Sequence, residues 1–153
     1  MLHALTGSAG GRLLLLVVLL AVTSVLWLAI RRRDGRFRLA RLASDAVLTG
    51  EDLGRPLGRR ATFVQFSTPT CASCPQVSRT LSTIADHETG VVHVEVPADR
   101  RPDLVRRFGV LRTPTVLLLG PEGAVRSRTS GPLARHQAIA ALSEHAGSSH
   151  AAA

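Results

Sequence analysis

The segment Ala61-Thr-Phe-Val-Gln-Phe-Ser-Thr-Pro-Thr-Cys71-Ala-Ser-Cys74 joins an apolar run to two closely spaced thiols. Residues 61–67 are expected to form a buried strand, because they make a short apolar run. Apolar residues then recur at intervals of four and three, at Val77, Leu81 and Ile84. This spacing predicts a helix over about residues 72–88. The two cysteines, which are the only ones in the chain, therefore lie where a strand gives way to a helix.

A Cys-x-x-Cys pair at such a turn can alternate between dithiol and disulfide, and the N-terminus of the helix lowers the pKa of the first thiol. Two structural roles compete with this interpretation. A structural disulfide usually closes a longer loop, and a structural zinc site needs four ligands where only two thiols exist. The pattern favours redox chemistry over zinc or an inert pair.

The rest of the chain continues the alternation of strands and helices. The patterns predict a strand at 91–96, a helix from Pro102 that stops at Gly109, a hairpin of 115–119 and 124–129 around Gly120-Pro-Glu-Gly123, and a closing helix with Ile139 and Leu142. The first strand, helix and second strand form a right-handed βαβ crossover. The predicted order is β-α-β-α-β-β-α.

This order, with the cysteines after the first strand, resembles the thioredoxin family. The resemblance spans about residues 61–146 and rests on three motifs together with Gly123 and Gly131: Phe63-Val-Gln-Phe-Ser67, Cys71-Ala-Ser-Cys74 and Val110-Leu-Arg-Thr-Pro-Thr-Val-Leu-Leu-Leu119. It implies an α/β, thioredoxin-like fold, in which a central mixed sheet is flanked by helices.

The resemblance also implies roles for four residues. Cys71 is the attacking thiolate, and Cys74 is the resolving thiol that closes the disulfide. Thr113-Pro114 looks like the cis-proline loop of the family, in which the residue before the proline pairs with an extended substrate segment. The alternative is a plain turn proline. The chemistry requires neither a metal nor a nucleotide cofactor.

At four positions, this chain carries a residue other than the one usual in the family. Thr70 replaces the usual Trp before the first cysteine, and Ser73 replaces the usual Pro before the second, so we expect an altered reduction potential. Gln65 stands where many thioredoxins bury an Asp that helps to deprotonate the second cysteine, so we expect slower resolution. His93 lies near where the family carries a lysine beside that Asp. It is a candidate proton relay, or else a strand residue without a catalytic role.

The N-terminal part of the chain contains an apolar run of 18 residues, Leu13 to Ile30, whose only polar members are Thr23 and Ser24. This length suits a helix that spans a membrane, and Trp27 suits the interface. The run ends in Arg31-Arg32-Arg33 rather than an Ala-x-Ala-like site. We therefore expect a retained anchor instead of a cleaved signal peptide.

All 19 basic residues are arginines, the net charge is +8, and six arginines lie within residues 31–41. Nucleic-acid binding is not expected, because the aromatic side chains that would stack on bases are nearly absent. The positive-inside rule places the soluble domain in the cytoplasm, with an extracytoplasmic domain as the alternative. The arginines are also suited to bind anionic lipid headgroups.

The predicted organisation is an N-terminal segment (1–12), a transmembrane anchor (13–30), a basic juxtamembrane linker (31–60), a thioredoxin-like domain (61–146) and a disordered tail (147–153). The predicted function is a membrane-tethered thiol–disulfide oxidoreductase that reduces protein disulfides. Its partners are protein clients, an upstream redox partner and the membrane. The alternative is a non-catalytic adaptor or redox sensor that binds a partner at Thr113-Pro114. The composition resembles that of high-GC bacteria, so the expected location is the bacterial plasma membrane.

Overall fold

The structure is a computed structural model, and it describes residues 9–33, 38–39 and 47–150. The chain forms two compact units, Met1–Arg33 and Asp34–Ala153. The first unit contains helix α2 (Ala9–Arg33), and the second contains the sheet and the other helices that the structure describes.

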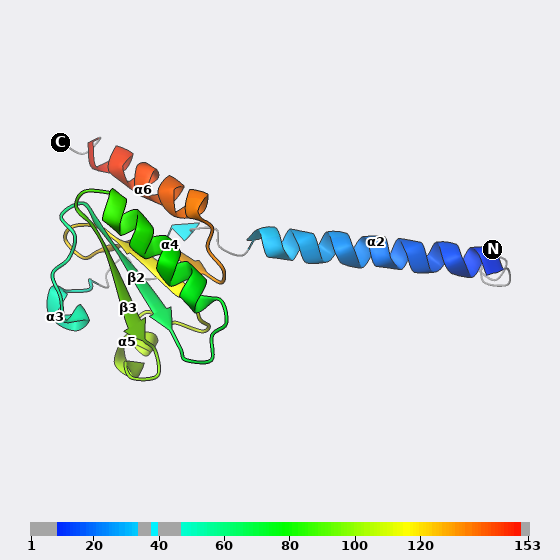
Figure 1. The fold of residues 1–153 in the computed structure, drawn as a ribbon, viewed down its shortest axis with the longest axis horizontal. Coiled ribbons are helices and arrows are strands. Elements are labelled where there is room, and N and C mark those ends of the chain that lie inside the picture. The colour runs from blue at the N-terminus through cyan, green and yellow to red at the C-terminus, as the bar shows by residue number, and fades with distance from the viewer. Residues whose placement is uncertain (1–8, 34–37, 40–46, 151–153) are drawn as a thin grey trace. The chain divides into compact units, whose positions relative to one another are not determined.

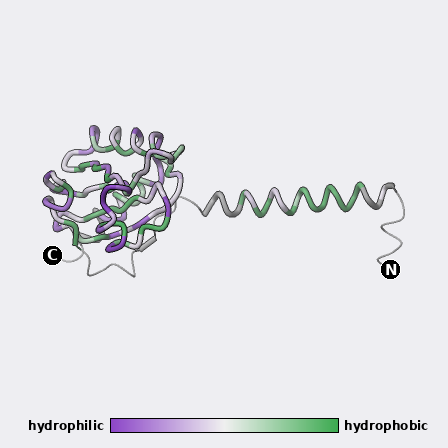
Figure 2. The backbone as a smooth tube through the Cα atoms, turned by 90° about the horizontal axis from the view of Figure 1, so that it is seen from below, coloured by the Kyte–Doolittle hydropathy of each residue, from purple (hydrophilic) through white to green (hydrophobic). Residues whose placement is uncertain are grey.

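Helix α2 contains the apolar run in which the sequence predicts an anchor. Its described side chains between residues 13 and 28 are exposed, with Leu16 at 58% and Trp27 at 58%. Figure 2 shows the hydrophobic character of this helix along much of its length. Within the described part of the chain, no helix is long and apolar enough to cross a membrane. The anchor at residues 13–30 stays a prediction.

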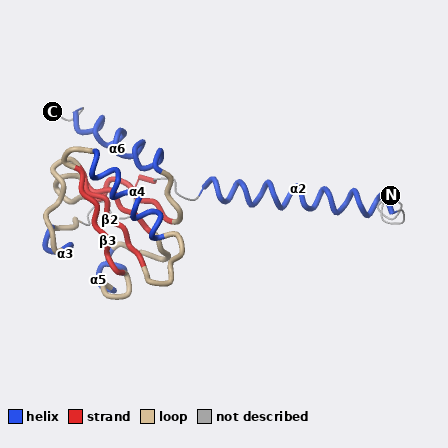
Figure 3. The backbone as a smooth tube through the Cα atoms, in the orientation of Figure 1, coloured by secondary structure: helices blue, strands red, loops and turns tan. Residues whose placement is uncertain are grey.

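The second unit is built on a mixed sheet (Figures 1 and 3). Its strands are β1 (Arg38–Leu39), β2 (Ala61–Ser67), β3 (Val91–Pro97), β4 (Thr115–Leu119) and β5 (Val125–Ser130), in the spatial order β1-β5-β4-β2-β3. Strands β2 and β3 are parallel, and the other pairs are antiparallel. The helices are α3 (Gly50–Leu53), α4 (Cys74–His87), α5 (Pro102–Arg107) and α6 (Arg135–His150). The predicted order of strands and helices from residue 61 onward is confirmed.

The core has two layers because neighbouring residues of each strand point to opposite faces of the sheet. On one face, Phe63 and Leu118 pack with α4 and α6, which lie side by side over the sheet (Figure 1). On the other face, Val64 and Leu117 pack with Leu104 of α5. All seven residues of β2 are buried, as expected of a strand covered on both faces.

The structure differs from the sequence prediction at some element ends. Helix α4 begins at Cys74 rather than near residue 72, and Pro75 lies in its first turn, where the missing N–H has no partner to lose. The buried core includes Leu48, and β1 pairs with β5, although both precede the predicted domain boundary at residue 61. Helix α6 continues to His150, past the predicted start of the tail, while residues 151–153 lie outside the described residues.

Candidate active site

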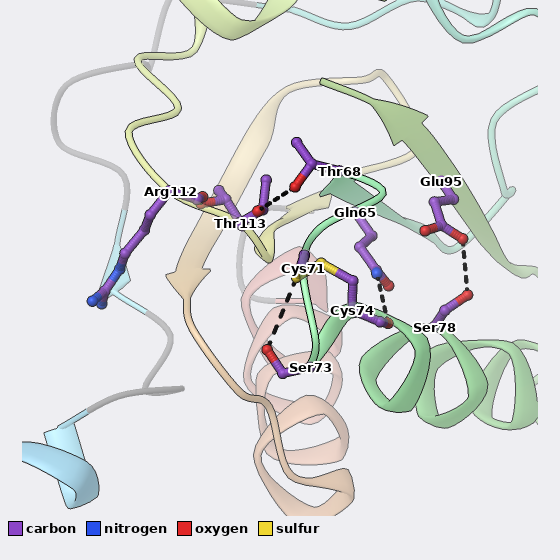
Figure 4. Close-up of a disulfide and its surroundings, with 10 residues drawn as sticks. Gln65, Thr68, Cys71, Ser73, Cys74, Ser78, Glu95, Arg112 and Thr113 are labelled. Carbon is purple, nitrogen blue, oxygen red and sulfur yellow. Dashed lines mark hydrogen bonds between the residues drawn. A yellow bond between two sulfur atoms is a disulfide. The ribbon is translucent and has the colours of Figure 1, made fainter. Parts of the chain in front are cut away.

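The two cysteines form a disulfide at the end of β2 that points toward the loop before β4 (Figure 4). Their sulfur atoms are 2.01 Å apart and their Cα atoms 5.5 Å apart. Cys71 lies in the turn before α4 and is half-buried, whereas Cys74 is the first residue of the helix and is 3% exposed. Cys71 is therefore more accessible to solvent than Cys74.

The turn around the disulfide is held by backbone hydrogen bonds. The N–H of Cys71 donates to the carbonyl of Thr68 at 3.1 Å, and the N–H of Cys74 donates to the carbonyl of Cys71 at 3.3 Å. Ser73 is the N-cap residue of α4, but its side chain makes no capping bond. Its Oγ lies instead 4.0 Å from Sγ of Cys71. Since a disulfide sulfur carries no hydrogen, the hydroxyl is the donor in this weak contact.

The loop before β4 forms the opposite side of the site. The Thr113–Pro114 peptide bond is cis, as the sequence motif predicts. The hydroxyls of Thr68 and Thr113 are 3.0 Å apart, so they connect this loop to the turn that carries Cys71 (Figure 4). The hydroxyl of Thr115 donates to the carbonyl of Arg112 at 2.7 Å. These bonds fix the loop beside the disulfide, while the substrate-contact role of Thr113 and Pro114 stays a prediction.

Gln65 lies on β2 and is fully buried. Its Nε2 donates to the carbonyl oxygen of Cys74 at 3.0 Å, so the side chain holds the first turn of α4 against β2. Its Oε1 is buried and has no hydrogen-bond partner. A buried acceptor without a donor is unfavourable, by about 1–3 kcal/mol. The amide therefore supports the fold through one end only.

His93 does not occupy the position beside Gln65 that the relay hypothesis gives it. In the parallel pairing of β2 and β3, His93 is the partner of Phe63, and Glu95 is the partner of Gln65. The Nδ1 of His93 lies 3.0 Å from the hydroxyl of Ser82, eight residues beyond Cys74. No described hydrogen bond joins His93 to either cysteine. Its relay role stays a prediction without structural support.

Burial controls the protonation of His93. Its Nε2 is buried and has no hydrogen-bond partner, so the imidazolium, with a proton on each nitrogen, would have one N–H unsatisfied. Burial lowers the pKa of His93, the charge of Glu95 raises it, and Arg55 lowers it further. The neutral imidazole is consequently favoured in the folded protein.

Three polar residues near the site were not singled out by sequence reasoning: Thr68, Ser78 and Glu95. Ser78 donates to the carboxylate of Glu95 at 3.0 Å. The sequence carries part of this signal, because the i, i+4 spacing places Cys74 and Ser78 on one side of the helix and the alternation of β3 fixes the face of Glu95. The contact between Ser78 and Glu95 follows only from the register of the strands. In the described part of the chain, no three His, Cys, Asp or Glu side chains are grouped so that they could hold a metal ion.

This fold and this cysteine pair define the thioredoxin-like thiol–disulfide oxidoreductases as a class. The thioredoxin family matches residues 51–144, which is more than half of the chain. The chain therefore belongs to the thioredoxin family, and its Cys71–Cys74 pair supports thiol–disulfide redox activity.

Solved structures show the same fold. Chloroplastic thioredoxin z is 22% identical with a TM-score of 0.53, and the match covers 58% of this chain and 80% of that one. Thioredoxin-2, a component of the protein secretion machinery of the malaria parasite, is 20% identical with a TM-score of 0.54, covering 61% of this chain and 91% of that one. A malarial protein is 21% identical with a TM-score of 0.51, covering 56% and 97% respectively. No curated protein matches the chain.

Proposed function

We propose that this protein is a membrane-tethered oxidoreductase that reduces the disulfides of protein clients. The observation that carries the proposal is the unequal burial of the two cysteines: Cys71 is half-buried beside the Thr113–Pro114 loop, and Cys74 is 3% exposed. Reduction of a client disulfide requires a first thiol that the client can reach and a second thiol that is protected from other reactants.

The reaction begins with the dithiol form. The thiolate of Cys71 attacks one sulfur of the client disulfide, which breaks that bond and releases the other client sulfur as a thiolate. Cys74 then loses its proton and attacks Sγ of Cys71. The mixed disulfide breaks, the client leaves as a dithiol, and the Cys71–Cys74 disulfide remains. Two electrons have passed to the client, and an upstream dithiol partner returns them.

The loop at Thr113–Pro114 is the site where the client segment binds. Thr113 lies within reach of the turn of Cys71, since its hydroxyl is 3.0 Å from that of Thr68. A client strand that pairs with the backbone at Thr113 brings its own disulfide to the exposed cysteine. Backbone pairing at Thr113 selects which client disulfide reaches Cys71, and it does not require a deep binding pocket.

The membrane tether is the run of residues 13–30, and the protein belongs to the bacterial plasma membrane. The exposed apolar side chains of α2 support this part of the proposal, because soluble proteins rarely expose a continuous apolar surface of this length. Six arginines follow within residues 31–41. By the positive-inside rule, they place the redox domain in the cytoplasm, where it acts as a reductant.

Trapping with cysteine variants tests the catalytic role. Cys74→Ser removes the resolving thiol, so the full chain should accumulate mixed disulfides between Cys71 and client proteins, visible on non-reducing gels. Cys71→Ser is the matched control and should trap few or none. If the two variants trap equally little, the chain is a binding module and not an oxidoreductase.

Thiol labelling in cells tests the topology. Intact cells that produce the full chain are treated with a reductant and then a maleimide, neither of which crosses membranes. A cytoplasmic domain should be labelled only after the cells are permeabilised. Labelling of Cys71 in intact cells would place the domain outside the cytoplasm and would contradict the reductant role.

A further inference from the structure

A polar region lies between β3 and the side of α4 that carries Cys74. Cys74 and Ser78 are one helical turn apart, so they lie on the same side of the helix. Gln65 and Glu95 are register partners on the neighbouring strands, and both side chains project toward α4 (Figure 4). The resolving cysteine, an amide and a carboxylate thus share one small region.

The contacts in this region orient the carboxylate. The hydroxyl of Ser78 donates to Oε2 of Glu95 at 3.0 Å. The amide of Gln65 is held by the first residue of α4, because its Nε2 donates to the carbonyl oxygen of Cys74 at 3.0 Å. Glu95 is therefore tied to α4 one turn beyond Cys74, and Gln65 is tied to Cys74 itself.

Two groups of this region can accept a further hydrogen bond, because Ser78 donates to only one oxygen of Glu95 and Oε1 of Gln65 has no donor. Oε1 of Gln65 is buried and unpartnered, and the carboxylate of its register partner Glu95 accepts as well. A single water molecule has two O–H donors and can donate to two such acceptors. Glu95 is exposed and lines a pocket of about 330 Å³ with Ser67 and Thr68, so solvent reaches the carboxylate.

We propose that Glu95 is the proton acceptor for Cys74, acting through a water molecule held by Oε1 of Gln65. The proposal rests on the oxidoreductase function proposed above. It assigns to an exposed carboxylate on β3 a task that the amide of Gln65 cannot perform, because an amide has no basic lone pair at neutral pH.

Protons and electrons balance in this step. In the mixed disulfide, the S–H of Cys74 gives its proton to the water, which gives a proton to the carboxylate of Glu95. The Cys74 thiolate attacks Sγ of Cys71, a new S–S bond forms, and the bond from Cys71 to the client sulfur breaks. The client sulfur leaves as a thiolate and takes a proton from solvent, and the protonated Glu95 returns its proton to solvent.

Few other charged groups face Glu95. His93 lies two residues away on β3, Asp99 and Arg100 line the same pocket from the following loop, and the residues that face it from α4 and β2 are the uncharged Ser78 and Gln65. Asp99 carries the same charge as Glu95 in the same pocket. Neutralising Asp99 therefore shows whether the position of the Glu95 carboxylate or only the net charge of the pocket affects Cys74.

The test uses the reduced full chain in detergent and the chromogenic disulfide 5,5′-dithiobis(2-nitrobenzoate), followed by stopped flow. The first phase reports the attack of Cys71, and the second reports the attack of Cys74 on the mixed disulfide, because each releases one coloured thiolate. In Glu95→Gln, the first phase should be unchanged. The second should slow by at least about tenfold at pH 7 and approach the wild-type rate above about pH 9.5, where thiols ionise without a base.

The control variant is Asp99→Asn, in which both phases should match the wild type within about twofold. An unchanged second phase in Glu95→Gln from pH 6 to 9.5 overturns the proposal. An equal slowing in Asp99→Asn overturns it too, since charge rather than position would then be responsible. If the wild-type chain shows no first phase, the oxidoreductase function fails and this inference fails with it.

Discussion

Ser73 lies between the two cysteines at the N-cap position of α4, yet its hydroxyl does not bond to a backbone amide of that helix. The hydroxyl instead approaches Sγ of Cys71 at 4.0 Å. When the disulfide is reduced, the same hydroxyl can donate to the Cys71 thiolate. Hydrogen bonds to charged groups are stronger than those to neutral ones. Ser73 therefore makes no side-chain cap for α4, but its hydroxyl can stabilise the thiolate of Cys71.

Ser73→Ala should make Cys71 less reactive. Loss of about 1 kcal/mol of stabilisation of the thiolate corresponds to about fivefold slower alkylation by iodoacetamide near pH 7. Ser73→Thr keeps the hydroxyl and should retain most of the wild-type rate. An unchanged rate in Ser73→Ala would show that the contact does not act on the thiolate.

At the scale of whole elements, the hairpin of β4 and β5 depends on a glycine that the sequence places in a four-residue turn. Gly123 has φ of +84°, and a Cβ there would lie 2.0 Å from the carbonyl oxygen of Leu48. The N–H of Leu48 donates to the carbonyl of Gly123 at 3.0 Å. The turn therefore packs directly on the backbone of Leu48, which is a buried core residue.

Gly123→Ala should destabilise the fold by about 3 kcal/mol, at the upper end of ordinary substitutions, because strain and a backbone clash combine. Gly54→Ala is the matched control: Gly54 has φ of +67° with nothing within 4 Å of the added Cβ. It should cost about 1–2 kcal/mol. Chemical denaturation in detergent measures both, and equal losses would contradict the close approach to Leu48.

Two partly buried histidines, His93 on β3 and His145 on α6, give the fold a dependence on pH. Burial lowers the pKa of His93 in the folded state below its ordinary value of 6.5, and burial lowers that of His145 as well. Above about pH 6.5, both states are neutral and the stability is complete. As the pH falls below that value, the unfolded chain takes up protons that the folded chain refuses, so the free energy of unfolding decreases.

Thermal melts between pH 7.5 and pH 5.5 should therefore show a decrease in Tm that becomes smaller in His93→Gln. His87→Gln, at an exposed position at the end of α4, is the matched control for the chemical change from His to Gln. The same slope in all three proteins would exclude His93 as a source of the dependence.

The strands and helices were predictable because their apolar periods are clear, and β2 and β4 begin and end where the sequence indicates. The cysteine pair and the cis-proline loop were predictable because their residues are adjacent in sequence. The position of Glu95 beside Gln65 could not be predicted from the sequence. It depends on the register of β2 against β3, and a shift of two residues keeps every side chain on its face while replacing Glu95 with His93. The burial of Leu48 likewise depends on a tertiary contact with Gly123.

At the scale of the whole molecule, the proposed function joins a redox domain to a membrane helix. Side chains of α2 such as Leu16 and Leu20 are 58% and 65% exposed. In the proposed function, their apolar surface provides the attraction to lipid, and the arginines after Ile30 set the orientation. A tether of this kind restricts the domain to clients near the membrane surface and raises their effective concentration.

The double variant Leu16→Arg, Leu20→Arg should release the chain from membranes, because each arginine near the centre of a span costs about 2.5–3.5 kcal/mol on an insertion scale. The expected result is a shift from the membrane pellet to the soluble fraction after alkaline carbonate washing. Leu16→Val, Leu20→Val should stay in the pellet. A double-arginine variant that also stays there would argue against residues 13–30 as the anchor.

The equilibrium reduction potential of the Cys71–Cys74 couple decides whether the domain is a reductant. The full chain in detergent is equilibrated with graded dithiothreitol buffers, alkylated and weighed by mass spectrometry. We expect a single two-electron transition near about −270 mV, the potential of a thioredoxin-like reductant. A transition above about −180 mV would contradict the reductant role, and the absence of any transition would contradict redox activity altogether.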